Sequence, residues 1–240
     1  MKKQTNLYIF AYASIMVIVV AAILSFASIA LKPAQMKNLE IEKKLDILRS
    51  VNLAADASNV KDKNSYVEGE FDKFIKQRLV VDYKGNVKEG VDAFEVTLKE
   101  EQAKDIEDRN LPLYVCQFED GSVKYIIPVL GKGLWGPIWG NIALNEDMNT
   151  IYGVTFDHKG ETPGLGADIN KPCFMEPFKG KQIMNGDKFV SIIVHKGGAP
   201  EGDIHGVDAI SGGTITSKGL EAMVKTCLSD YVPYFNNVRK

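Results

Sequence analysis

An uncharged apolar run near the start of the chain limits what this sequence can fold into more than any other feature. From Leu7 to Leu31 the sequence reads LYIFAYASIMVIVVAAILSFASIAL, without a single Asp, Glu, Lys or Arg. A helix of that length crosses the hydrocarbon layer of a membrane, which is about 30 Å thick. The sequence therefore predicts a transmembrane helix at 7–31, after a short tail at 1–6.

A cleaved secretory signal is the alternative interpretation of this run. Lys2 and Lys3 precede it, and small residues lie near its end. The apolar part of a signal peptide is about 7 to 15 residues long, however, and this run is longer. We therefore expect a retained membrane anchor. The lysines on both sides do not decide its orientation, because a long downstream domain is translocated largely regardless of such charges.

The chain as a whole has the composition of a globular protein, which excludes several classes of protein. With 29 Lys and Arg against 31 Asp and Glu, the net charge is -2, whereas a nucleic-acid-binding protein needs a basic excess or a basic stripe. The three cysteines and three histidines are scattered, and no C-x-x-C pair occurs. The pattern therefore predicts no disulfide framework, no iron–sulfur cluster and no metal site made by this chain alone.

The part that follows the anchor is predicted to be one α+β domain. Pro33 is expected to end the membrane helix, and a charged stretch with a partly helical apolar stripe predicts a stalk helix from Met36 to about Ala57. We expect a polar surface connection at 58–70, a short helix at 71–79 and a turn at 84–86.

From Leu113 onward the sequence has the texture of β-strands. Two apolar segments, 113–118 and 123–130, flank a turn at Glu119-Asp120-Gly121 and predict a hairpin. Further strands are expected at 139–144, 151–156 and 189–194.

The last helix is the clearest element of the sequence. Its apolar residues recur at helical spacing from Leu220 to Tyr231, which also makes Cys227 a core residue. Directly before it stands DAISGGTITS, residues 208–217, with two glycines and four hydroxyl groups. The N-terminus of a helix presents unpaired N–H groups that favour a phosphate. On these grounds alone, a helix cap with a tight turn is the simpler interpretation.

The string at 208–217 resembles the flavin-attachment motif, which consists of Asp, two variable residues, Ser or Thr, Gly, Ala and Thr. In that motif the final Thr carries FMN through a phosphoester. The match makes Thr214 the acceptor, and Gly213 stands where the family usually has Ala.

Further segments resemble the C subunit of the sodium-translocating NADH:quinone reductase. They are GKGLWG at 131–136, GETPGLG at 160–166, KLDILR at 44–49 and the single N-terminal span. The G subunit of the Rnf ferredoxin:NAD complex shares the anchor and the attachment motif, and it remains the alternative. A flavin-free, membrane-anchored binding or assembly protein is the alternative from another class.

The resemblance implies a membrane-anchored electron carrier with covalently bound FMN, which relays electrons within a sodium-pumping NADH:quinone oxidoreductase. The translocase activity would belong to the complex, whose other membrane, flavin and iron–sulfur subunits are the expected partners. An FAD-dependent flavin transferase would attach the FMN on the periplasmic side of the bacterial inner membrane. The stalk helix and the N-terminal part of the soluble domain would occupy 32–110, and the FMN-binding core 111–240.

The expected cofactor-binding residues come from three segments, and the resemblance implies neither a catalytic residue nor a metal ligand. Besides Thr214 they are Ser211, Gly212, Gly213, Thr216, Ser217, Glu161, Thr162, Gly164, Leu165, Gly166 and Trp135. Gly164 and Gly166 are expected to let the backbone approach the flavin ring closely. Trp135 and Trp139 are candidates for lining the ring or a subunit interface.

Overall fold

A computed structural model describes residues 6–239 of the chain. It divides into two compact units, Met1–Lys43 and Lys44–Lys240. The predicted tail at 1–6 lies outside the described residues except for Asn6, which begins the first helix. The predicted domain boundaries at 32–110 and 111–240 remain predictions.

The first helix, α1 (Asn6–Ser50), contains the apolar run, and its first part is long and apolar enough to cross a membrane. The expectation that Pro33 ends this helix is wrong, because α1 continues through it. Proline inside a helix removes one backbone hydrogen bond, and the helix-favouring residues on both sides outweigh that local cost. The helix ends at Ser50, short of Ala57, because the chain turns through left-handed conformations at Asn52 and Ala54.

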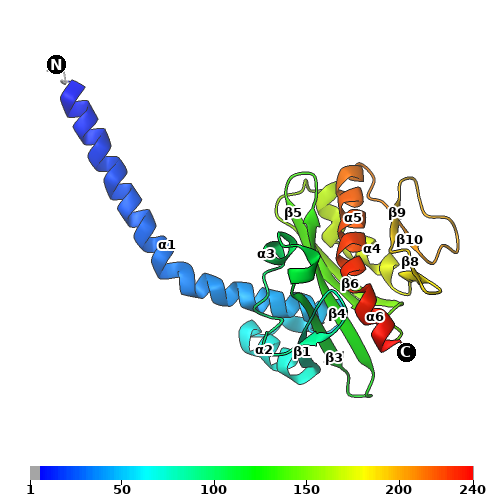
Figure 1. Cartoon of the computed structure of the whole chain (residues 1–240). Coiled ribbons are helices and arrows are strands. Elements are labelled where there is room, and N and C mark those ends of the chain that lie inside the picture. The colour runs from blue at the N-terminus through cyan, green and yellow to red at the C-terminus, as the bar shows by residue number, and fades with distance from the viewer. Residues whose placement is uncertain (1–5, 240) are drawn as a thin grey trace. The chain divides into compact units, whose positions relative to one another are not determined.

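A six-stranded antiparallel sheet forms the centre of the second unit (Figure 1). The strand order is β2-β1-β3-β4-β5-β6, and the hairpin predicted around Glu119-Asp120-Gly121 is confirmed as β3 and β4. The strands are β1 (Ile75–Val81), β2 (Val87–Lys88), β3 (Leu111–Gln117), β4 (Val123–Lys132), β5 (Pro137–Leu144) and β6 (Ile151–His158).

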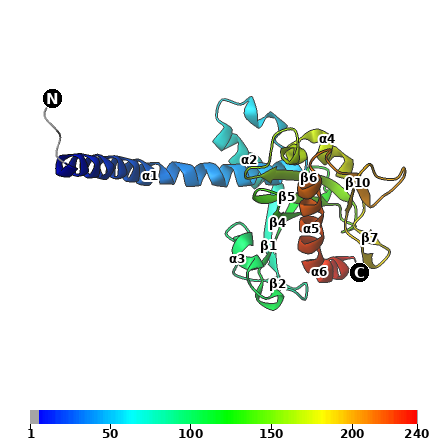
Figure 2. The same cartoon turned by 90° about the horizontal axis from the view of Figure 1, so that it is seen from above.

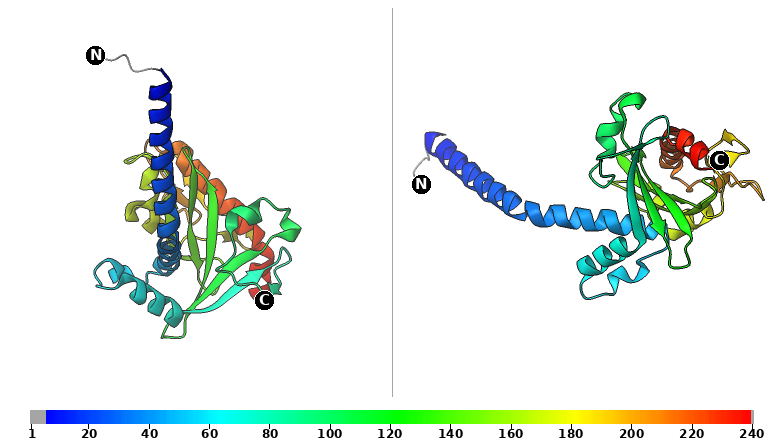
Figure 3. Two further views of the ribbon diagram at one scale, coloured as in Figure 1. Left: turned by 90° about the vertical axis from the view of Figure 1, so that its left-hand side faces the viewer. Right: turned by 60° about the horizontal axis from the view of Figure 1, so that its bottom comes forward.

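Helices cover both faces of this sheet. On one face lies α2 (Lys63–Phe74), whose Phe71 ring contacts Tyr114 of β3 at a centroid distance of 6.5 Å. On the other face lie α5 (Thr214–Asp230) and α6 (Val232–Val238), which follow one another over the sheet (Figures 2 and 3). Leu220, Met223, Val224 and Leu228 of α5 are buried as their spacing predicts, so the α+β fold class is confirmed.

The expectations for 58–70 and 71–79 are only partly confirmed, since 59–62 precedes α2 as a connection and 71–74 is helical. The polar segment contains the start of α2, because Asp62 caps the helix by accepting a hydrogen bond from the Ser65 N–H at 3.2 Å. The second segment switches from helix to β1 at Ile75. A bulge between Ile75 and Gln77 breaks the pairing with β3, and it also breaks the apolar–polar alternation that would have marked a strand.

The single strand expected at 189–194 is also wrong. Ser191 adopts φ 64° and turns the chain, so the apolar run is divided between β8 (Lys188–Phe189) and β9 (Ile193–His195). β9 pairs in parallel with β10 (Gly206–Asp208), which leads to the start of α5. The remaining elements are short: α3 (Leu98–Gln102), α4 (Pro172–Met175), β7 (Met184–Asn185) and four 3₁₀ turns, Ala55–Ser58, Ile106–Asp108, Gly166–Asn170 and Glu176–Phe178.

Candidate functional site

Three segments that lie far apart in the sequence meet around a pocket of about 230 Å³. They are the turn between β4 and β5, the loop after β6 and the N-terminus of α5. The lining residues are Leu134, Trp135, Glu161, Thr162, Leu165, Gly166, Gly212, Gly213, Thr214, Ile215 and Thr216.

Glycines let α5 lie directly against the strand that leads into this pocket. A Cβ on Gly219 of α5 would collide with the carbonyl oxygen of Lys132, and a Cβ on Gly131 would lie 2.5 Å from Cβ of Met223. A Cβ on Gly133 would lie 2.5 Å from Oε1 of Glu161. Two glycines of GKGLWG therefore serve close packing, because a side chain at either position would push α5 or the Glu161 loop away.

The loop after β6 owes its shape to two glycines with different tasks. Gly164 has φ 75°, a left-handed conformation that favours glycine, and its N–H donates to Asp168 Oδ1 at 3.1 Å. A Cβ there would meet nothing within 4 Å. Gly166 is packed closely instead, because a Cβ would collide with the Thr216 hydroxyl and lie 2.6 Å from Glu161 Oε2.

Glu161 joins all three segments through its buried carboxylate. Its side chain is only 4% exposed, yet Oε1 accepts the Trp135 N–H at 2.8 Å and Oε2 accepts the Thr216 hydroxyl at 2.5 Å. Burial raises the pKa of Glu161, but hydrogen bonds from Thr216 and from the Trp135 and Gly136 N–H groups outweigh it, so the pKa lies below the usual value. Glu161 is therefore ionised at neutral pH.

The four hydroxyl groups of residues 208–217 are not equivalent. Thr216 is 2% exposed and donates to Glu161, while the buried Ser217 accepts the Ile210 N–H at 3.1 Å. Ser211 is exposed outside the pocket lining. Thr214 is half-buried at the first position of α5 and lines the pocket, and its hydroxyl makes no hydrogen bond with the described residues.

The pocket brings together most of the residues selected from the sequence, and it adds two. Ser211, Ser217 and Gly164 do not line it. Leu134 and Ile215 do line it, with exposed fractions of 45% and 61%, and sequence reasoning missed them. Both are direct neighbours of selected residues, and an apolar side chain beside a glycine-rich turn was the available signal.

Other candidates from the sequence lie elsewhere. Trp139 lines a different cavity of about 180 Å³ next to Asp46 and Arg49. Within the described range 6–239, no group of three or more His, Cys, Asp and Glu side chains is arranged to hold a metal ion. Asp208 of the motif lies outside the pocket lining and accepts the Ala199 N–H at 2.7 Å.

Comparison with known proteins identifies the family. Residues 133–229 match the model of the FMN-binding domain. The chain is 33% identical to the Na(+)-translocating NADH-quinone reductase C subunit of Vibrio alginolyticus, over 92% of this chain and 91% of the relative. The corresponding C subunit of Neisseria meningitidis serogroup B is 30% identical over 92% and 90% of the two chains.

Two solved structures agree with this result. The crystal structure of the C subunit from Parabacteroides distasonis is 41% identical and superposes with a TM-score of 0.75, covering 85% of this chain and 96% of that one. The structure of Shewanella oneidensis NqrC is 28% identical with a TM-score of 0.67, covering 82% and 98%. The chain therefore belongs to the NqrC family, the C subunits of Na(+)-translocating NADH-quinone reductases.

Proposed function

We propose that Thr214 carries FMN through a phosphoester and that the flavin occupies the pocket at the N-terminus of α5. The chain is an FMN-carrying electron-transfer subunit of a sodium-translocating NADH-quinone reductase, a translocase complex whose other subunits are its partners. Neither the relatives nor the solved structures favour the Rnf alternative, and the FMN-binding domain argues against the flavin-free one.

One observation supports Thr214 above its neighbours. Two threonines line the pocket at the start of α5, and the hydroxyl of Thr216 is already used as a donor to Glu161. The hydroxyl of Thr214 has no partner among the described residues and borders the pocket at the helix N-terminus. It is therefore the hydroxyl best placed to form a bond with an incoming phosphate.

The residues around the pocket fit FMN. The N-terminus of α5 provides unpaired N–H groups and the positive end of the helix dipole for the phosphate. Leu134, Trp135, Leu165 and Ile215 provide apolar walls for a planar ring. Pockets that enclose a ligand of drug size have volumes of about 300–1,000 Å³. At about 230 Å³ this pocket holds part of the cofactor and leaves the rest at the surface.

Attachment requires a flavin donor, and we infer that it is FAD, supplied by a flavin transferase. A bond forms between the Thr214 oxygen and the phosphorus of the FMN half, while the pyrophosphate bond of FAD breaks and AMP leaves. The hydroxyl proton passes to the transferase or to water. The half-buried position of Thr214 leaves the oxygen accessible for this reaction.

Bound FMN supplies electron exchange, which no side chain provides. The chain's own residues hold and orient the group. A covalent bond at Thr214 prevents dissociation, Glu161 fixes the three segments of the pocket wall, and the exposed side chains of Trp135 and Ile215 leave one side open toward redox partners. Electron transfer then needs no diffusion of the cofactor between subunits.

We also propose that the first part of α1 is retained as a membrane anchor and that the flavin domain lies on the periplasmic side of the bacterial inner membrane. A reporter enzyme that is active only outside the cytoplasm, fused after Lys240, should be active. An inactive periplasmic reporter together with an active cytoplasmic reporter at the same position would overturn this orientation.

Denaturing-gel fluorescence tests the covalent link. The full chain is co-expressed with a flavin transferase, purified in detergent and separated under denaturing conditions. A yellow fluorescent band at the mass of the chain is the expected result, because a phosphoester survives unfolding. Fluorescence that separates from the polypeptide would contradict the proposed attachment.

A further inference from the structure

A buried negative charge lies in the wall of the flavin pocket. Glu161 is 4% exposed and lines the pocket directly, together with Thr214 and Trp135. Its two carboxylate oxygens point toward different segments, Oε1 to the Trp135 N–H and Oε2 to the Thr216 hydroxyl. The carboxylate is therefore fixed in place on both sides.

Within residues 6–239, no Lys or Arg neutralises the charge of Glu161, and the one charged neighbour that lowers its pKa is His158. The hydrogen-bond donors to the carboxylate are a hydroxyl and backbone N–H groups, all of them neutral, and neither Lys nor Arg forms an ion pair with it. The His158 ring contacts the backbone of Glu161, whose N–H donates to His158 Nδ1 at 3.1 Å, and it does not bond the carboxylate. The Glu161 side chain therefore contributes close to one full negative charge to the pocket wall.

The packing around Glu161 prevents the charge from moving away. Gly133 and Gly166 lie so close that a Cβ on either residue would come within 2.6 Å of a carboxylate oxygen. Rotation of the carboxylate would break both of its hydrogen bonds at once. A group in a pocket of about 230 Å³ consequently remains within several ångströms of this charge.

We propose that Glu161 lowers the reduction potential of the FMN carried by this subunit. This inference rests on the proposed attachment at Thr214. Reduction adds negative charge to the bound group, and a fixed, buried carboxylate repels that charge more strongly than an exposed one because water screens it less. Glu161 thus favours the oxidised form and makes the reduced form a stronger electron donor.

Glu161→Gln is the direct test, because the side chain keeps its size and both contacts. The amide oxygen can accept the Trp135 N–H, and the amide nitrogen can donate to the Thr216 oxygen. Asp168→Asn is the matched control. It removes one negative charge from a carboxylate that accepts the Gly164 N–H, pairs with Lys171 and does not line the pocket.

The midpoint potential is measured by spectroelectrochemical titration of the full, flavin-loaded chains in detergent. Glu161→Gln should raise the equilibrium constant for reduction by about tenfold or more, which is the scale for charges several ångströms apart near a protein surface. Asp168→Asn should change it far less. Equal potentials in the wild type and Glu161→Gln, or an equal shift in both variants, would overturn the proposal.

Ile215→Lys is a second test, and it leaves the buried hydrogen bonds of Glu161 in place. Ile215 lines the pocket and is 61% exposed, so a lysine there adds a positive charge to the pocket wall without burying it. The potential should shift in the positive direction, by less than in Glu161→Gln because solvent screens the lysine. An unchanged potential in Ile215→Lys would contradict an electrostatic effect of the pocket wall.

The outcomes separate this inference from the proposed function. If wild-type chain carries no flavin after denaturation, the attachment at Thr214 fails, and the inference fails with it. If wild type and Glu161→Gln are both flavinylated and have the same potential, the attachment stands and only the role of Glu161 fails. The unfolding temperature of each variant without flavin shows whether the fold is intact.

Discussion

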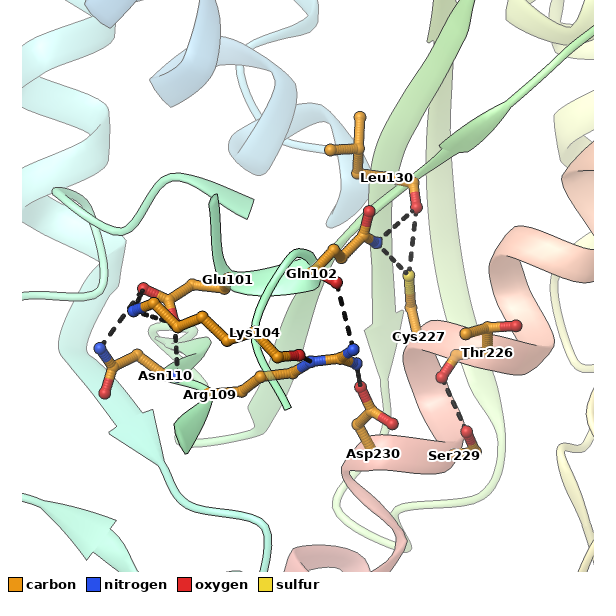
Figure 4. A network of polar contacts seen from close by, with 10 residues as sticks. All are labelled: Glu101, Gln102, Lys104, Arg109, Asn110, Leu130, Thr226, Cys227, Ser229 and Asp230. Atoms are coloured by element: carbon orange, nitrogen blue, oxygen red, sulfur yellow. Dashed lines mark hydrogen bonds and ion pairs between the residues drawn. The ribbon is translucent and has the colours of Figure 1, made fainter. Parts of the chain in front are cut away.

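The two ends of α5 are both held by a carboxylate, yet their surroundings differ. At the N-terminus, Glu161 accepts the Thr216 hydroxyl beside a pocket of about 230 Å³. At the C-terminus, Asp230 pairs with Arg109 at 2.9 Å (Figure 4). The cavity beside this pair is much smaller, at about 30 Å³.

The C-terminal end satisfies its polar groups with partners from the same chain. Arg109 also donates to the carbonyl oxygens of Lys104 at 3.0 Å and Gln102 at 3.2 Å, and the Gln102 amide donates to the Leu130 carbonyl at 2.8 Å (Figure 4). The N-terminal end leaves the Thr214 hydroxyl without a partner among the described residues. One end of the helix is therefore tied to the rest of the chain, whereas the other leaves a hydroxyl group at the edge of a pocket.

Replacing a threonine at each end of α5 should have very different effects on flavin attachment. Thr214→Ala removes the proposed acceptor and should abolish denaturation-resistant flavin fluorescence without abolishing expression. Thr226→Ala, an exposed position in the C-terminal half of α5, should leave the fluorescence unchanged. Both variants are compared on one denaturing gel at equal protein load. Flavin fluorescence that persists in Thr214→Ala would show that Thr214 is not the acceptor.

Removing the ion pair at the C-terminal end of α5 should reduce stability and leave the flavin in place. Arg109→Ala leaves Asp230 without its partner, and both side chains are only 19% exposed, so we expect a loss of about 1–3 kcal/mol in the free energy of unfolding. The matched control is Arg78→Ala, because Arg78 pairs with Asp92 at a more exposed site and should cost less than about 1 kcal/mol. Denaturant unfolding measures both.

A change of flavin content in Arg109→Ala at a temperature where the chain is folded would contradict the separation of the two ends. The expected result is a lower unfolding midpoint with the same flavin-to-protein ratio.

The thiol near the C-terminal end of α5 should have a smaller effect. Cys227 is buried, contacts the Leu130 carbonyl at 3.4 Å, and burial raises its pKa to about 11. Cys227→Ala should leave a small cavity that costs about 1 kcal/mol, without loss of flavin. Cys173→Ala, at an exposed position, should be neutral. Thermal unfolding and in-gel fluorescence of the two variants check this, and loss of flavin from folded Cys227→Ala would reveal thiol chemistry at α5.

Glu161 and Asp230 should make the stability of the fold depend on pH in opposite directions, and this effect should be small. The pKa of Glu161 lies below its usual value of 4.5, so this carboxylate contributes stability above that pH and loses it as the pH falls through the lower, folded-state value. Burial raises the pKa of Asp230 above 3.8 despite Arg109, so its ionised form costs stability that is recovered on acidification.

Thermal unfolding midpoints between about pH 3 and 7 test this contrast. The stability of wild type relative to Glu161→Gln should fall as the pH decreases, and the stability of wild type relative to Asp230→Asn should rise. The same sign in both comparisons would show that the two carboxylates are not held differently.

Sequence patterns predicted elements whose signals are local. The apolar spacing from Leu220 to Tyr231 predicts a helix, and the turn at Glu119-Asp120-Gly121 predicts a hairpin. Each signal lies within a short stretch of sequence, and both predictions are confirmed. The strand β1 and the break at Ser191 were missed because a bulge and a left-handed residue depend on the neighbouring strands and not on local propensity.

The candidate site depends on long-range contacts that no local pattern contains. Resemblance to a family grouped 131–136, 160–166 and 208–217, but it gave no physical reason for the grouping. The structure supplies that reason. Glu161, in the segment 160–166, accepts hydrogen bonds from Trp135 in the segment 131–136 and from Thr216 in the segment 208–217. The sequence does not indicate that Glu161 is buried. The glycines that enclose its carboxylate, Gly133 and Gly166, lie on two different loops.

Peptide mapping of the flavin-loaded chain tests directly whether Thr214 is the residue that carries FMN. Trypsin cleaves after Lys196 and Lys218 and releases residues 197–218, which contain Ser211, Thr214, Thr216 and Ser217. Fragmentation of this peptide assigns the added mass to one residue. We predict the mass of FMN less one water on Thr214 alone. An adduct on Thr216, Ser217 or Ser211, or a peptide without added mass, would show that Thr214 is not the attachment site.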